Sequence, residues 1–425
     1  MLSYTVDKTL PFLTCAAMNT GVCADPEPLL SPPQIQLLRS PCVSLIVGPG
    51  LSSQHLVQIC TLTSLTYLKL QITKTAPETM MTGMFMDSLT KLQVLNKLKL
   101  SFPPRLPLLL PKLPSLQSLT IGPWLPSQHH LQICTLTGLT YLQLQFTRAD
   151  PESMTQGMLL DSLTNLQVLN ELRLSCPPRL PLLLSKLASL ESLTVAVGTP
   201  ATLDMSALTQ VYSVRLGQRN KKKMRVPVVL PTGPKARLSA LAIHTSCEIQ
   251  NLHKANLTQI EISGRPGIMH AVSWPTALPH LQHLTVCNVT PPYMLPHKWQ
   301  HYTQLRCLCL PKYQGFLPLW FSNLQQLKTL SMPDAQMEGI PECLFQLSKL
   351  KRLELSRFQG LLTMSVVKLA DLLQLTYLEF QKFKHTLLHY EQAVLLDLEI
   401  ALRKRKLKLK REHPDEWTYV LDTCQ

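Results

Sequence analysis

The chain has 425 residues, of which 45% are hydrophobic and only 15 are glycine, so it can bury a continuous core. Its formal net charge is +15, but no run of residues reaches the ~18 apolar positions of a membrane-spanning helix. The 12 cysteines include no CxxC pair. This cysteine pattern excludes a dense disulfide framework and indicates scattered thiols in a reducing compartment.

The N-terminal segment, residues 1–42, carries no repeat pattern. We predict that it covers the first exposed edge of the array that follows, as a cap or an irregular segment. Its short apolar patch has Asp7 beside Lys8, which gives it the wrong flank for a signal peptide. We therefore expect a cytoplasmic protein, with nuclear and secreted locations as minor alternatives.

Residues 43–217 are dominated by an internal duplication. Residues 51–70 (LSSQHLVQICTLTSLTYLKL) align with residues 125–144 (LPSQHHLQICTLTGLTYLQL) at an offset of 74 residues. A shorter unit, LxxLxxLxL, recurs inside each copy. Its last two leucines alternate with a polar residue, which is strand periodicity, and its earlier leucines at steps of three suit a turning or helical segment.

One such unit cannot bury its leucines alone, so we predict that successive units stack as a ladder of about fifteen parallel strands. The third apolar position of each unit marks the strand centre. The predicted strand centres are Leu45, Leu68, Leu98, Leu119, Leu142, Leu172, Leu193, Val214, Leu241, Ile260, Leu284, Leu308, Leu330, Leu353 and Leu378.

Residues 218–237 interrupt the repeats with charge, proline and glycine, and we interpret them as a basic loop insertion. The repeats resume over residues 238–382. Residues 313–332 (YQGFLPLWFSNLQQLKTLSM) and 337–355 (MEGIPECLFQLSKLKRLEL) show the most regular form. In each, a Leu-Pro or Ile-Pro step, at Pro318 and Pro341, precedes the next LxxL.

This pattern resembles the leucine-rich-repeat family, and the C-terminal third resembles its plant-type and Ras-group intracellular repeats. The resemblance implies an α/β leucine-rich-repeat solenoid, a horseshoe or arc with a parallel β ladder on its concave face. Short helical or irregular segments would form the convex side. The family's asparagine after the strand is missing here, for example at Thr73 and Pro103, so we expect irregular curvature.

The C-terminal segment, residues 383–425, is predicted to be a capping helix followed by a basic tail. Residues 390–406 place apolar side chains at helical spacing, and the basic run Arg403–Arg411 is assigned to the same helix. Trp417 and Tyr419 could fold the tail back onto the array. The apolar positions of the predicted helix are Val394, Leu395, Leu398 and Leu402.

Residues that flank the strand leucines should project from the exposed face of the ladder, where Tyr and Arg suit protein recognition. The alternative is that they are solvated strand positions without a ligand. The candidate partner-binding residues are Tyr67, Lys69, Gln71, Lys97, Lys99, Tyr141, Gln143, Arg173, Arg352, Glu354 and Tyr377.

Two basic stretches hold most of the net charge and could attract an anionic membrane surface or an acidic partner, or simply be solvated. The second could also be a nuclear import signal. Neither is interleaved with aromatic residues, which argues against nucleic-acid binding. The basic-patch residues are Lys221, Lys222, Lys223, Arg225, Arg403, Lys404, Arg405 and Lys406.

No catalytic constellation can be assembled. The sequence lacks HExxH, GxSxG, GxxxxGK[ST] and GxGxxG, and the Cys307–Cys309 pair lacks the further ligands of a metal site. We expect no enzyme activity and no cofactor. The predicted function is a protein-interaction scaffold. Alternatives are a fragment of a larger immune-type or ubiquitin-ligase receptor, or a peripheral binder of anionic membrane or nucleic acid.

Overall fold

A computed structural model describes most of the chain as two compact units, Met1–Ala201 and Thr202–Gln425. Each unit is a solenoid of short strands and is treated by itself below. The described residues are 2–6, 13–16, 42–47, 57, 59–71, 88–101, 113–122, 133–145, 162–175, 182–197, 202–218, 226–245, 247–264, 268, 272–289, 294–355, 364–383, 389–404, 407–411 and 416–423.

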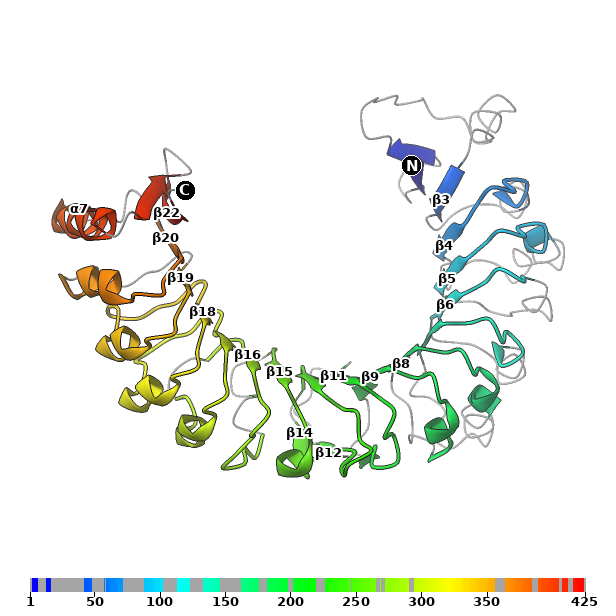
Figure 1. Cartoon of the computed structure of the whole chain (residues 1–425). Coiled ribbons are helices and arrows are strands. Elements are labelled where there is room, and N and C mark those ends of the chain that lie inside the picture. The colour runs from blue at the N-terminus through cyan, green and yellow to red at the C-terminus, as the bar shows by residue number, and fades with distance from the viewer. Residues whose placement is uncertain are drawn as a thin grey trace. The chain divides into compact units, whose positions relative to one another are not determined.

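Unit 1 is a ladder in which strands β3 to β9 follow one another and pair in parallel (Figure 1). At its start β1 pairs in parallel with β3, and β2 pairs antiparallel with β1. The elements are β1 (Leu2–Val6), β2 (Leu13–Ala16), β3 (Cys42–Val47), β4 (Tyr67–Gln71), β5 (Lys97–Ser101), β6 (Ser118–Ile121), β7 (Tyr141–Gln145), η3 (Leu163–Asn165), β8 (Glu171–Ser175), η4 (Leu182–Lys186) and β9 (Ser192–Val197).

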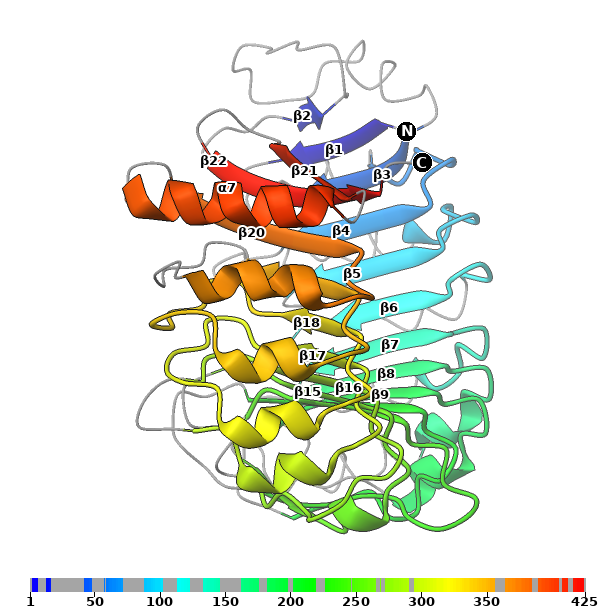
Figure 2. The ribbon, with the colours of Figure 1, turned by 60° about the vertical axis from the view of Figure 1, so that its left-hand side comes forward.

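Unit 2 continues the same plan, with a parallel ladder β11-β13-β15-β16-β17-β18-β19-β20. Short helices stack as a second layer beside these strands (Figure 2). The elements are β10 (Leu203–Asp204), β11 (Ser213–Gln218), β12 (Val226–Val229), β13 (Ala240–Ile243), β14 (Cys247–Gln250), η5 (Leu252–Lys254), β15 (Gln259–Ile262), β16 (His283–Val286), η6 (His297–His301), β17 (Cys307–Cys309), η7 (Leu319–Asn323), β18 (Thr329–Ser331), η8 (Glu342–Gln346), β19 (Arg352–Leu355), η9 (Met364–Asp371), β20 (Tyr377–Phe383), α7 (His389–Arg403), β21 (Leu407–Arg411) and β22 (Glu416–Thr423).

Every predicted strand centre lies in an observed strand, and within each unit the centres stand opposite one another. In unit 1 Leu45 pairs with Leu68 and so on to Leu193. In unit 2 Val214 pairs with Leu241 and so on to Leu378. All of these side chains are buried. The predicted α/β leucine-rich-repeat solenoid is therefore confirmed. The register is informative because a one-residue slip would turn the apolar side chains of a strand outward.

The most regular repeats turn at proline, as the sequence predicts. Pro318 and Pro341 adopt extended backbone conformations immediately before η7 and η8. Pro296 does the same before η6. Proline suits this place because its fixed φ starts a helical turn where no backbone donor is needed. Each short helix then buries one or two side chains, Phe321 in the case of η7.

The turns after the strands of unit 2 share a left-handed residue in place of the missing asparagine ladder. Gly264, Asn288, Lys312 and Asp334 all have positive φ. The Asn288 Nδ2 atom donates to the Gly264 carbonyl oxygen at 2.6 Å. The Lys312 backbone N–H donates to the Pro333 carbonyl at 2.8 Å. Successive turns are thus joined by backbone and side-chain hydrogen bonds at one repeat position.

Lys312 is the bulkiest residue in this left-handed position, with φ of 57°. Lys312→Gly should raise the free energy of unfolding by about 0.5–1 kcal/mol, because a Cβ is unfavourable in this region and glycine is not. The backbone hydrogen bond to Pro333 is retained. Urea denaturation checks this, with Lys312→Ala as the control. Equal stabilities for the glycine and alanine variants would contradict it.

One part of the predicted loop insertion is a strand. Val226–Val229 forms β12, which lies between β10 and β14 in a separate three-stranded parallel sheet. The alternation in VPVV buries Val226 and Val228. Pro227 stands outside the register with β10, so its missing N–H costs no hydrogen bond on that side. Lys221, Lys222, Lys223 and Arg225 lie outside the described residues.

The basic run Arg403–Arg411 is not one helix, so that assignment is wrong. Helix α7 ends at Arg403, and Leu407–Arg411 forms β21, which pairs antiparallel with β22. The reason is the alternation LKLKR, which has the period of a strand. Strand β22 also pairs antiparallel with β20, with Tyr419 opposite Phe380 and Trp417 opposite Lys382.

Helix α7 packs against η9 and buries the four apolar residues that the spacing picks out, Val394, Leu395, Leu398 and Leu402. Leu396 and Ile400, on the outer side of this helix, are exposed. The helix bounds differ from the predicted 390–406 by a few residues at the C-terminal end, where the strand of the following hairpin begins.

Buried thiols line the core at repeated positions. Burial raises the pKa of Cys60, Cys134 and Cys247 from about 9 to about 12. Above pH ~9 the unfolded chain loses these thiol protons first, so stability should fall as pH rises from about 9 toward 12 and be unaffected below. Urea midpoints at pH ~8 and ~10.5 check this. A Cys60→Ala, Cys134→Ala, Cys247→Ala variant should lose less stability over that interval, and an equal loss would contradict the assignment.

Candidate functional site

The strands of unit 1 carry two rows of side chains on the face opposite the leucine core. We call this the open strand face. Register places each row member beside the next along the ladder. The first row is Ser44, Tyr67, Lys97, Ser118, Tyr141, Glu171 and Ser192, and the second row is Lys69, Lys99, Thr120, Gln143, Arg173 and Thr194.

Strands β4 and β5 place an aromatic ring among three cations. Tyr67 stands opposite Lys97, whose Nζ lies 5.6 Å from the ring centroid, and Lys69 stands opposite Lys99. Burial raises the pKa of Tyr67, so its phenol stays neutral at physiological pH. The Lys97 ammonium group thus lies over the Tyr67 ring as in a cation–π pair.

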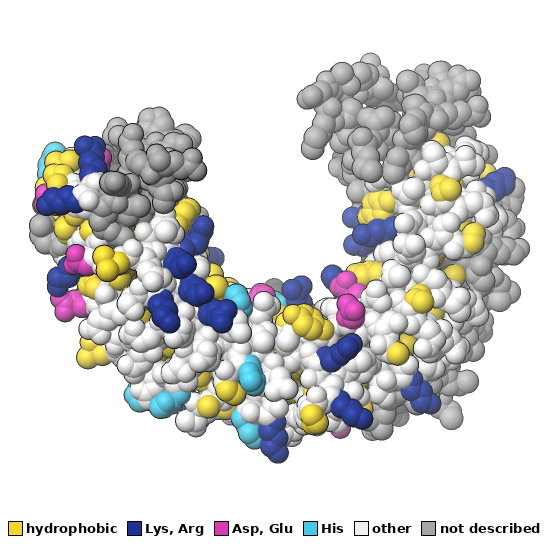
Figure 3. All heavy atoms as spheres, viewed as in Figure 1, with side chains coloured by type: hydrophobic (Ala, Val, Ile, Leu, Met, Phe, Trp, Pro, Cys, Tyr) yellow, Lys and Arg dark blue, Asp and Glu magenta, His cyan; other side chains and the backbone are white. Residues whose placement is uncertain are grey.

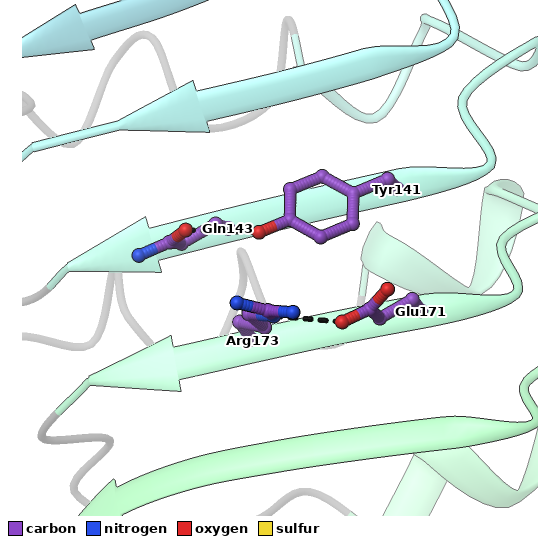
Figure 4. A network of polar contacts seen from close by, with 4 residues as sticks. All are labelled: Tyr141, Gln143, Glu171 and Arg173. Carbon is purple, nitrogen blue, oxygen red and sulfur yellow. Dashed lines mark hydrogen bonds and ion pairs between the residues drawn. The ribbon is translucent and has the colours of Figure 1, made fainter. Parts of the chain in front are cut away.

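Strands β7 and β8, the second copy of the duplication, form a closed polar network (Figure 4). The Tyr141 hydroxyl donates to Gln143 Oε1 at 2.9 Å. The Arg173 Nε donates to Glu171 Oε1 at 2.7 Å, and the Arg173 Cζ lies 5.3 Å from the Tyr141 ring centroid. Burial raises the pKa of Tyr141, and Arg173 opposes that shift. The glutamate thus neutralises the arginine and fixes it near the ring.

Unit 2 carries a third pair of ring and cation on its own open strand face. The Arg352 Cζ lies 3.6 Å from the Tyr377 ring centroid, on the neighbouring strand. The Tyr377 hydroxyl donates to Glu379 Oε2 at 2.6 Å. Burial and that hydrogen bond raise the pKa of Tyr377 to about 12. Arg352 also makes a 3.8 Å ion pair with Glu354, so this cluster holds one arginine and two carboxylates.

The predicted partner-binding residues of each unit therefore occupy one face, and most of them touch one another. Gln71 belongs to β4, but its side chain lies outside the described residues. In the basic segments, Arg403 pairs with Glu399 at 2.5 Å and Lys404 is exposed, while Arg405 and Lys406 lie outside the description. In the part of the chain that the structure describes, no helix is both long and apolar enough to cross a membrane.

A row of cations in unit 2 was missed by the sequence analysis. Arg306, Lys328 and Lys351 each directly precede a strand and are exposed. They are neighbours, since the Lys328 N–H donates to the Arg306 carbonyl and the Lys351 N–H to the Lys328 carbonyl. Figure 3 shows Lys and Arg side chains gathered on this part of unit 2. The sequence signal is a basic residue directly after the first leucine of LRCL, LKTL and LKRL, which is the second apolar position of the repeat unit.

Two cysteines of β17, Cys307 and Cys309, lie on the open strand face of unit 2, and Cys287 directly follows β16. Cys307 and Cys309 stand opposite His283 and Thr285. Burial and the neighbouring Cys309 raise the pKa of Cys287, and burial raises that of Cys309 itself. The thiols of Cys287 and Cys309 are therefore protonated and weakly reactive at neutral pH. Among the described residues, no three His, Cys, Asp or Glu side chains are grouped so as to hold a metal ion.

No protein-family model and no curated protein matches the chain. Several solved structures are similar to it. An internalin from Listeria monocytogenes is 18% identical over 75% of this chain and 81% of that chain, with TM-score 0.39. A Leptospira interrogans LRR protein is 19% identical over 88% and 85%, with TM-score 0.41. The LRR ectodomain of the Arabidopsis thaliana receptor kinase GASSHO1/SCHENGEN3, in complex with CASPARIAN STRIP INTEGRITY FACTOR 2, is 16% identical over 80% and 50%, with TM-score 0.28.

The fold is assigned from the chain's own strand register, since these identities and TM-scores are too low to carry more. Parallel strands with one buried apolar row and one open polar face define a repeat solenoid. The LxxLxxLxL unit supplies the strands of both parallel ladders and gives this chain a leucine-rich-repeat fold.

Proposed function

We propose that this protein is a non-catalytic scaffold that binds protein partners through its open strand faces. The observation that carries the proposal is the repeated pairing of a tyrosine ring with a cation on the neighbouring strand. Such pairs are Tyr67 with Lys97, Tyr141 with Arg173, and Tyr377 with Arg352. None of these side chains belongs to the core, so packing of the leucines does not require them.

Tyrosine and arginine supply much of the binding energy in protein interfaces, because each offers a large contact surface at a modest cost in conformational entropy. Here the rings are also held in place before any partner arrives. Tyr141 is fixed by its hydrogen bond to Gln143, and Tyr377 by its hydrogen bond to Glu379. Preorganised side chains lose less freedom on binding, which raises affinity. A merely solvated face would be equally stable with serine or threonine at these positions.

The proposed setting is the cytoplasm. The seven cysteines whose side chains the structure describes, among them Cys247 and Cys343, form no disulfide. Buried thiols of this kind are usual where glutathione keeps proteins reduced. Finding the native protein oxidised in the secretory pathway would contradict this location.

Affinity capture of the full chain followed by mass spectrometry tests the function. The variant changes Tyr67, Lys69, Tyr141 and Arg173 to alanine together, and we expect its captured set to lose the partners of the wild type. A matched control changes four exposed residues in the turns and short helices, away from the strand face. These residues are Lys91, Gln93, Gln167 and Lys186. An unchanged captured set in the strand-face variant would refute the assignment of the binding face.

A further inference from the structure

The three lysines of β4 and β5 form a compact basic site, which with Tyr67 we call the basic strand patch. Lys69 and Lys99 stand directly opposite each other on paired strands, and Lys97 lies two residues before Lys99. Paired strands are ~4.8 Å apart and alternate residues on one strand are ~6.6 Å apart. Three ammonium groups therefore share a small area of the open strand face.

No described residue neutralises this patch. Its three lysines make no ion pair with any residue in the described part of the chain. The positions beside it on the flanking strands are Ser118 and Thr120 on β6 and Ser44 and Ile46 on β3. Like charges opposite each other across a sheet are destabilising. Figure 3 shows Lys and Arg side chains on this part of unit 1.

The internal duplication provides a comparison within the same molecule. At an offset of 74 residues, Tyr67 corresponds to Tyr141 and Lys99 to Arg173. Lys69 corresponds to Gln143, and Lys97 to Glu171, which pairs with Arg173 at 2.7 Å. Among the described residues, the first copy thus carries three positive charges without an ion-pair partner, whereas the one arginine of the second copy is paired with Glu171. Both copies have the same buried leucines, so the fold does not require the three lysines.

We propose that the basic strand patch binds an extended acidic segment of a protein partner. This rests on the scaffold function proposed above and names the chemistry of one partner. In an extended peptide, alternate side chains point the same way at ~6.6 Å intervals, which matches the spacing of Lys97 and Lys99. Alternate carboxylates can therefore meet successive lysines, while the Tyr67 ring contacts the peptide between them.

The observations favour a polypeptide over other anions. A single ring offers no row of stacking platforms for nucleic-acid bases. Of the four flanking positions, Ser44, Ser118 and Thr120 are small polar residues, which do not insert into a lipid surface as large apolar side chains do. Charge complementarity with carboxylates also offsets the repulsion between Lys69 and Lys99.

The test measures fluorescence anisotropy of a labelled peptide of alternating glutamate and serine, titrated with the full chain. Lys69→Gln with Lys97→Glu copies the charges of the second copy and should weaken binding about tenfold at low salt. The matched control, Lys91→Gln with Lys186→Glu, makes the same charge change in exposed residues outside the strand face and should bind like wild type. Equal weakening in both variants would overturn the site.

The reverse change gives an independent readout. Gln143→Lys with Glu171→Lys should build a second patch and increase the amount of peptide bound at saturation, whereas no increase would count against the proposal. Binding of phosphatidylserine vesicles but not of the peptide would overturn the polypeptide assignment. If the fourfold alanine variant loses captured partners but the wild-type chain does not bind the acidic peptide, the proposal of an acidic segment is overturned and the scaffold function stands. An unchanged captured set in that variant would overturn the scaffold function itself.

Discussion

Replacing Trp299 by alanine should lower the free energy of unfolding by about 3–5 kcal/mol, the range for truncating a buried aromatic side chain. Trp299 lies in η6 and is 1% exposed. Its ring meets the Trp274 ring edge-on, with centroids 5.0 Å apart. Tyr302 lies in the same cluster, and its hydroxyl donates to the Pro275 carbonyl at 3.0 Å. Removing the indole would leave a cavity that these rigid neighbours cannot fill.

Trp299→Phe should cost much less, under ~1.5 kcal/mol. The Trp299 Nε1 donor is buried and finds no acceptor among the described residues. Removing an unsatisfied donor relieves a penalty of about 1–3 kcal/mol, which offsets part of the lost volume. Urea denaturation followed by circular dichroism compares the two variants, with the partly exposed Trp320→Ala as control. Equal losses for phenylalanine and alanine would mean that the indole N–H is well bonded.

The strand ladder could be predicted from the sequence because two independent periods agree. Leucines at steps of three and then two specify a turn and a strand, and the recurrence of the unit specifies stacking. Register needs no further information, since Leu68 is buried when it stands opposite another apolar strand centre such as Leu98. The prolines before η7 and η8 also predict where these two short helices begin.

The C-terminal hairpin could not be predicted in the same way. In Leu407–Arg411 the charge of the lysines suggested the solvated side of a helix, although their alternation with leucine has the period of a strand. Pairing with β22 decides between the two. A single short strand has no repeat to support it, so local pattern alone leaves helix and strand in competition.

The exposed face of the ladder was predictable, but the contacts on it were not. Alternation places Tyr141 and Arg173 on one face. Whether Arg173 pairs with Glu171, two residues away on its own strand, depends on rotamers. The cation row of Arg306, Lys328 and Lys351 was missed because only residues that flank the strand leucines were expected to be exposed, and these three precede their strands. Stacking brings equal repeat positions side by side, so such rows can be found by reading the repeats as columns.

Leu98→Ala and Leu172→Ala should each lower stability by about 2–5 kcal/mol, and by nearly equal amounts. These leucines are the same position in the two copies of the duplication. Leu98 stands between Leu68 and Leu119, and Leu172 has leucines on both sides in the same way. Both are 0% exposed. Because their neighbours match, the cavity left by either truncation should be alike.

Hydrogen exchange of the strand amides is the suitable measurement, because each repeat contacts mainly its neighbours and the loss should stay local. Leu98→Ala should speed exchange in β4, β5 and β6, and Leu172→Ala should do so in β7, β8 and β9. Lys99→Ala, on the open strand face beside Leu98, is the control and should change stability by no more than ~0.5 kcal/mol. A loss below ~1 kcal/mol for Leu98→Ala would contradict its place in the core. Because the two copies share their leucines, a large difference between them would have to come from positions that differ, such as Ile121 and Val195 in the core or Lys97 and Glu171 on the open face.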